Sequence, residues 1–185
     1  MRRFAERRSP SPDGRRRRSI ATSLAVAFTI LSGVVIAGPV AASPTAAMLS
    51  IFAGTGIAGT PTAGPATSSN LDSPFGVAVD GAGNVYIADA NNMVIEKVTP
   101  DGTLSVIAGT GTAGAPTAGP ATASNLNRPT GVAVDGAGNV YIADFNNNRV
   151  EKVTPGGTLT IIAGTGTWGS PTPGPATSSM LHDPA

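Results

Sequence analysis

The chain has 185 residues, no cysteine and a formal net charge of +1. The absence of cysteine excludes a disulfide framework and any thiolate chemistry, whether catalytic or metal-binding. The small net charge averages two unlike parts, since residues 1–42 carry +6 and residues 43–185 carry −5. Because the larger part is acidic, it lacks the basic surface that binding to a phosphate backbone needs, and nucleic acid is excluded as a partner.

Residues 1–42 have the three parts of an export signal. A cationic stretch is followed by an apolar run over residues 20–42, which ends in the small residues Val40-Ala41-Ala42. We expect cleavage after Ala42, followed by a short linker over residues 43–48.

An uncleaved membrane anchor is the alternative interpretation of the same apolar run. Its 23 residues would form a helix of about 35 Å, which is long enough to cross a bilayer. The pair Arg17-Arg18 leaves the general and the twin-arginine export routes both open. On every one of these interpretations the rest of the chain is expected outside the cytoplasm, in the extracellular space or the cell envelope.

A block of 55 residues then occurs twice and begins a third time. The sequence Ala-Gly-Thr-Gly opens residues 53–107, residues 108–162 and the partial copy 163–185, and the two full copies are identical at 42 of 55 positions. A fixed period of this size indicates a repeat architecture, in which no unit can bury its apolar faces alone.

Each copy contains four short β-branched or apolar runs separated by turn residues. In the second copy the runs cover residues 131–134, 140–143, 150–153 and 158–162. Such runs, joined by tight turns, predict an antiparallel four-stranded meander. A sheet that is apolar on both faces and repeated in tandem is typical of a β-propeller blade.

The turns of both copies carry the same polar residues. A carboxylate or amide that accepts turn N–H groups explains these positions better than a calcium loop, which needs further acidic ligands. We therefore expect structural turn roles, and no metal site, for Asp80, Asn84, Asp89, Asp135, Asn139 and Asp144.

The predicted fold class is all-β: an incomplete β-propeller over residues 49–185. It would consist of a leading fourth strand at Leu49–Ala53, two full four-stranded blades and a trailing connector with a short helical turn. Since a propeller needs at least four blades, we expect either a fragment of a longer propeller or a two-blade protomer that closes by oligomerising.

Three segments of each copy resemble the signature of the NHL repeat family, in the long form found in bacterial exported proteins and teneurin-like propellers. The first reads Pro-x-Gly-Val-Ala-Val-Asp, the second Gly-x-Gly-Asn-Val-Tyr-Ile-Ala-Asp, and the third opens on Asn-Asn and closes on Lys-Val. They stand at Pro74–Asp80, Gly81–Asp89 and Asn91–Val98, and again at Pro129–Asp135, Gly136–Asp144 and Asn146–Val153. The resemblance implies a propeller fold.

Residues that break the repeat are the candidates for ligand binding. Phe145 replaces Ala90, Arg149 replaces Val94, and Trp168 has no aromatic counterpart in the earlier copies. Exposed aromatic and arginine side chains favour recognition. The residues that repeat have structural interpretations: the Gly-x-Gly-x-x-Gly motifs are turns, and Glu96-Lys97 and Glu151-Lys152 are expected on solvated blade edges.

No catalytic residues are visible. His182, the single histidine, has no partner base or nucleophile near it in the sequence. We therefore expect an exported, non-catalytic scaffold without cofactor or metal, which binds a protein or another extracytoplasmic ligand and forms a homo-oligomer if the chain ends at residue 185.

Two other functions stay open. The propellers that the chain resembles include lactonases and lyases with a metal on the ring axis, but the expected axial strands Gly76–Val79 and Gly131–Val134 offer no ligand. An enzyme would need its catalytic residues in further blades. A structural repeat protein of the cell envelope is the third candidate.

Overall fold

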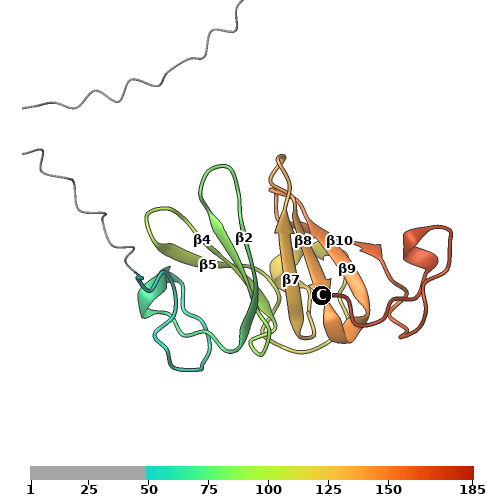
Figure 1. The fold of residues 1–185 in the computed structure, drawn as a ribbon, viewed down its shortest axis with the longest axis horizontal. Coiled ribbons are helices and arrows are strands. Elements are labelled where there is room, and N and C mark those ends of the chain that lie inside the picture. Colours follow the sequence, from blue (N-terminus) through green and yellow to red (C-terminus); the bar gives the residue numbers. More distant parts are fainter. Residues whose placement is uncertain (1–48) are drawn as a thin grey trace, which may run out of the picture. The chain divides into compact units, whose positions relative to one another are not determined.

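Two antiparallel sheets, one for each full repeat copy, make up the fold (Figure 1). The computed structural model describes residues 49–185, so the expected export signal, anchor and linker lie outside the described residues. The first sheet has the order β1-β5-β4-β3-β2 and the second the order β6-β10-β9-β8-β7. The expected four-stranded meander is confirmed in both copies: β2 (Pro74–Val79), β3 (Val85–Asp89), β4 (Val94–Val98) and β5 (Thr103–Ala108), then β7 (Pro129–Val134), β8 (Val140–Asp144), β9 (Arg149–Val153) and β10 (Thr158–Ala163).

Each sheet also has a fifth strand that the sequence did not predict. The two-residue strands β1 (Gly64–Pro65) and β6 (Gly119–Pro120) come from the connector that precedes each blade, and they pair with β5 and β10. The glycine of each strand has a positive φ, 126° at Gly64 and 136° at Gly119, which glycine adopts without steric cost. The connectors are thereby tied to the outer edge of the blade that they enter.

The leading fourth strand expected at Leu49–Ala53 does not form. A strand needs a neighbour with which to exchange hydrogen bonds, and no strand of the described residues pairs with this segment. Leu49, Ile51 and Phe52 are accordingly exposed by 101%, 71% and 49%. The expected helical turn is present in each connector as a 3₁₀ turn: η1 (Ala66–Ser68), η2 (Ala121–Ala123) and η4 (Ala176–Ser178).

Strand register decides which side chains share a face. In the first sheet Val85 pairs with Val98, while the next residue, Tyr86, pairs with Lys97. Because side chains alternate along a strand, these two pairs lie on opposite faces. We call the face with Val85 and its second-copy counterpart Val140 the front face, and the face with Tyr86 and Tyr141 the rear face.

The core lies where the rear face of the first sheet packs on the front face of the second. The first sheet contributes Tyr86, Ala88, Ile95 and Ala108, the second contributes Val140, Ile142, Val153 and Leu159, and the connector between them contributes Ala121 and Leu126. The inner strands β2 and β7 lie side by side (Figure 1), so close that a Cβ atom on Gly76 would lie 2.5 Å from the carbonyl oxygen of Thr130.

The front face of the first sheet is covered only in part: Ile87, Val98 and Leu104 are buried together with Ala66 of the connector, whereas the front-face side chains of β2 are exposed. Val77 and Val79 in β2 are 63% and 60% exposed, whereas the matching Val132 and Val134 are packed against the core. Of the helices within residues 49–185, none has the length and apolar character to cross a membrane.

Candidate functional site

Asp80 and Asp135 close the hairpins β2–β3 and β7–β8 in the same way. Asp80 Oδ1 accepts the backbone N–H groups of Ala82 and Asn84, both at 2.9 Å, and Oδ2 accepts the Asn84 side-chain amide at 2.7 Å and the Tyr86 hydroxyl at 3.0 Å. The hydrogen bond from the Asn84 side chain is the largest cause that lowers the pKa of Asp80 to about 2. With both oxygens engaged inside the turn, this carboxylate is placed to hold the hairpin.

Asp89 and Asp144 tie each blade to the connector before it. Asp89 Oδ1 accepts the backbone N–H of Asp72 at 2.9 Å, and Oδ2 accepts the Asn92 side-chain amide at 2.7 Å. Asp144 makes the matching bonds to Asn127 at 2.8 Å and to Asn147 at 2.6 Å. Both carboxylates are fully buried, so they are out of reach of a ligand.

The expectation that Glu96 and Glu151 lie on solvated blade edges is wrong. Glu96 pairs with Ile87 across β3 and β4 and therefore points into the apolar front face, and both glutamates have no exposed surface. No donor in residues 49–185 reaches their carboxyl oxygens. The lysines that follow them point to the other face, where Lys97 lies 5.7 Å from the Tyr86 ring and Lys152 lies 5.8 Å from the ring of Tyr141.

Burial keeps both glutamates protonated near neutral pH. Burial is the largest cause that raises the pKa of Glu96 to about 9, with the charge of Asp89 acting in the same direction. The pKa of Glu151 rises to about 8, because burial and Asp144 raise it while the nearby Arg149 lowers it. Within residues 49–185 no group of three or more His, Asp or Glu side chains is arranged to hold a metal ion.

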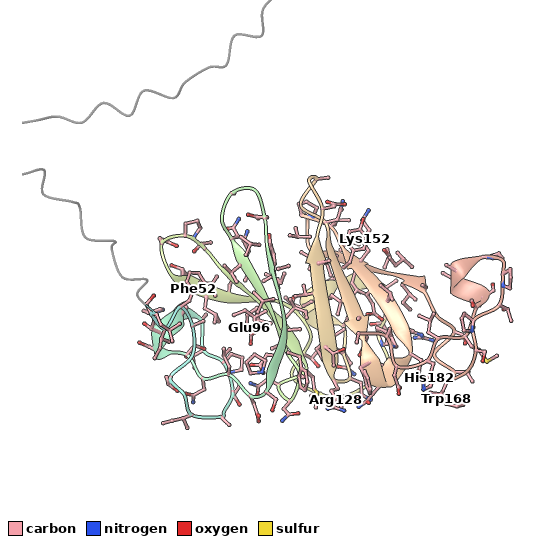
Figure 2. All side chains as sticks on the ribbon, viewed as in Figure 1. Phe52, Glu96, Arg128, Lys152, Trp168 and His182 are labelled. Atoms are coloured by element: carbon pink, nitrogen blue, oxygen red, sulfur yellow. The ribbon has the colours of Figure 1, made fainter. Side chains whose placement is uncertain are left out.

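Phe145 lies in a small cluster at the rim between the two blades. It opens the 3₁₀ turn η3 (Phe145–Asn147), and the guanidinium carbon of Arg128 lies 5.2 Å from its ring centroid. The same guanidinium lies 5.6 Å from the ring of Phe75, at the start of β2. We call Phe75, Arg128 and Phe145 the rim cluster; Figure 2 shows Arg128 at the lower edge of the sheets.

Sequence reasoning missed Arg128 and Phe75, although the signal that singled out Phe145 applies to them as well. Arg128 stands where the first copy has Ser73, and Phe75 stands where the second copy has Thr130. All three residues of the rim cluster therefore break the repeat. Only the structure reveals that they meet.

The other two candidates lie apart from this cluster. Arg149 donates from Nη2 to the carbonyl oxygen of Thr165 at 3.0 Å, which anchors the last connector to β9. Trp168 is 61% exposed and makes an edge contact with His182, with ring centroids 4.6 Å apart (Figure 2). Trp168 bridges to Leu181 as Ala113 does to Leu126, so Ala113 is its counterpart in the second copy.

A groove of about 470 Å³ between the blades offers less chemistry than the rim cluster. It is lined by Tyr86, Lys97, Thr154 and Pro155 among others. Its carboxylate, Asp80, is engaged in the hairpin turn, and its lysine lies over the Tyr86 ring.

The sheets and the repeat define the class of protein: tandem four-stranded blades of the β-propeller kind. The NHL repeat family model matches residues 126–152. The chain is 32% identical over 84 residues to Protein SUPPRESSOR OF QUENCHING 1, chloroplastic, from Arabidopsis thaliana, a match that covers 45% of this chain and 8% of the plant protein. Residues 126–152 of this chain therefore match an NHL repeat, and the sheets that contain them have the form of β-propeller blades.

Two solved structures from Bacteroides thetaiotaomicron share the fold. A structural genomics protein of unknown function has a TM-score of 0.55 and 23% identity, covering 70% of this chain and 31% of its own. An auxiliary nutrient binding protein has a TM-score of 0.50 and 18% identity, covering 58% of this chain and 30% of its own. The chain thus spans less than a third of each of these structures.

Proposed function

We propose that this chain is an exported, non-catalytic propeller scaffold that binds a protein ligand through the rim cluster. The observation that carries the proposal is the convergence of three repeat-breaking residues on one surface. The two copies are identical at 42 of 55 positions, whereas Phe75, Arg128 and Phe145 differ from their counterparts, and Arg128 contacts both rings. Aromatic and arginine side chains are enriched among the residues that dominate binding energy.

The acids that repeat in both copies support a scaffold role for the repeated positions. The carboxylate oxygens of Asp80 and Asp89 accept hydrogen bonds from turn and connector residues, and the side chain of Glu96 is buried in the front face of its sheet. A general acid or base must reach the proton that it transfers. The acids that repeat in both copies are therefore used for folding, and the surface that varies is left for recognition.

Export is the part of the proposal that rests on sequence. Residues 1–42 combine eight arginines with an apolar run and small residues before the expected cleavage site. Mass spectrometry of the chain recovered from the medium or the cell envelope tests it. A mature N-terminus after Ala42 supports export, and a full-length chain confined to the cytoplasm contradicts it.

Binding is tested with the purified full chain on peptide and glycan arrays. The matched control replaces each rim residue by the one at its place in the other copy: Phe75→Thr, Arg128→Ser and Phe145→Ala. We expect saturable binding by the wild type and a loss of at least tenfold in the triple variant, since about 1.4 kcal/mol corresponds to tenfold. The proposal is contradicted if the wild type shows no saturable binding. It is also contradicted if the triple variant binds as tightly as the wild type.

A further inference from the structure

The guanidinium of Arg128 has no acceptor within residues 49–185. The side chain is exposed, and neither a hydrogen bond nor an ion pair links it to any described residue. Its contacts are the two rings of the rim cluster. Of the other three cations in residues 49–185, Arg149 donates to the Thr165 carbonyl, while Lys97 and Lys152 each lie over a single tyrosine ring; Arg128 alone lies over two rings.

The local sequence keeps Arg128 free of a neutralising carboxylate. The first copy reads Asp72-Ser73 where the second reads Asn127-Arg128, so the adjacent acid is lost where the arginine is gained. The acid that this connector contacts, Asp144, is buried, and its oxygens accept hydrogen bonds from Asn127 and Asn147. The charge of Arg128 is therefore left for a partner.

The two rings position the Arg128 guanidinium so that it can bind a planar anion. Phe75 comes from the first blade and Phe145 from the second, so the arginine is held where the two blades meet. Aromatic rings shield a guanidinium from water and restrict its rotamers, while its N–H edges stay available. An arginine edge matches a carboxylate with two parallel hydrogen bonds, which a lysine cannot reproduce.

We propose that the rim cluster is a carboxylate-binding site, at which Arg128 receives an aspartate or glutamate side chain of an acidic peptide segment. This inference rests on the proposed binding function and names its ligand chemistry. Residues flanking the ligand carboxylate would pack on the Phe75 and Phe145 rings. Specificity then depends on one charge and two apolar surfaces.

The surroundings favour a peptide carboxylate over a phosphate or an acidic sugar. Residues 43–185 carry a net charge of −5, which opposes a phosphate with its higher charge more than a single carboxylate, and Arg128 compensates one negative charge. A sugar needs several polar groups for its hydroxyls. The neighbouring amides bond to each other instead, since Asn146 donates to Asn127 through both its backbone and its side chain at 3.1 Å.

The experiment titrates the ¹⁵N-labelled full chain with two blocked pentapeptides that differ only in a central glutamate or glutamine flanked by phenylalanines. The Arg128 side-chain N–H signals report binding. We expect the glutamate peptide to bind at least about tenfold tighter than the glutamine peptide. Arg128→Lys should lose most of that preference and Arg128→Ser all of it, whereas Arg149→Val should keep it.

Equal affinity for the two peptides, or a preference that survives in Arg128→Ser, overturns the proposal. A uronic acid disaccharide that binds tighter than the glutamate peptide overturns the choice of a peptide. If binding on the arrays depends on Phe75 and Phe145 but not on Arg128, the proposed scaffold function is supported and the proposed carboxylate site is contradicted. If neither the arrays nor the peptide titration shows binding, the proposed binding function and the proposed carboxylate site are both contradicted.

Discussion

Met93 and Asn148 hold the same turn position in the two blades with residues of different backbone preference. Both have left-handed backbones, with φ of 55° at Met93 and 47° at Asn148. A side chain with a Cβ atom is strained in this region, and asparagine tolerates it better than methionine. The first blade therefore carries a local strain that the second avoids.

Replacing Met93 with asparagine should stabilise the first blade by about 0.5–1 kcal/mol, because the same backbone is then held with less strain. Urea unfolding of the full chain measures the change in free energy. The reverse replacement, Asn148→Met, is the control and should destabilise, since Asn148 Oδ1 also accepts the Asp183 N–H at 3.2 Å. A Met93→Asn chain less stable than the wild type would contradict this account.

At the scale of elements, strands β2 and β7 of neighbouring blades approach each other closely. A Cβ atom on Gly76 would lie 2.5 Å from the Thr130 carbonyl oxygen and 3.0 Å from the Val132 nitrogen. These are backbone atoms, which cannot move aside without shifting a strand. Glycine at position 76 is thus required by the packing of one blade on the next.

Gly76→Ala should destabilise the chain by about 2 kcal/mol or more, since the added methyl group separates the inner strands or distorts them. Gly81→Ala is the matched control, because a Cβ atom there meets nothing within 4 Å. Thermal unfolding followed by circular dichroism compares the two. Equal melting temperatures would mean that β2 and β7 are not packed as described.

At the scale of the whole molecule, two sets of acids respond to pH in opposite directions. The pKa values of Asp80 and Asp135 fall to about 2, chiefly through hydrogen bonds from asparagine side chains. Burial raises the pKa of Glu96 to about 9, that of Glu151 to about 8 and that of Asp144 to about 6. The folded chain therefore holds protons that the unfolded chain has already released near neutral pH.

We expect the melting temperature to fall as pH rises from about 5 to about 9, because the unfolded state releases the glutamate protons near pH 4.5 and the folded state releases them later. Below about pH 4 stability should fall again, as Asp80 and Asp135 become protonated. Scanning calorimetry from pH 3 to about 9 measures the melting temperature over both limbs of this profile, the fall above about pH 5 and the fall below about pH 4.

The double variant Glu96→Gln, Glu151→Gln should flatten the limb above pH 5, because a neutral amide has no proton to release. Asp183→Asn changes an exposed acid and should leave that limb unchanged. A slope that persists in the double variant would mean that other groups, Asp144 among them, account for it.

Local patterns were sufficient to predict the blades. The β-branched and apolar run at Val85–Asp89 and the turn residues between Asp80 and Asn84 act over a few neighbours, so they can be read without knowing the rest of the fold. The same reading failed for Glu96, which looks like part of a charged edge beside Lys97 but points to the opposite face. It also failed for Leu49–Ala53, where a strand-like sequence has no pairing strand in the described residues.

By itself, the sequence determined the repeat, the strands, the turns and therefore the NHL-type blade, because each of these depends on residues close together in the chain. Tertiary structure decided which faces are covered and which residues meet. Val77 and Val132 occupy identical sequence contexts from Gly76 and Gly131 onward, yet only Val132 has a second sheet packed over it. Phe75 likewise meets Arg128 only because one blade packs against the next, and that contact is not encoded in any local pattern.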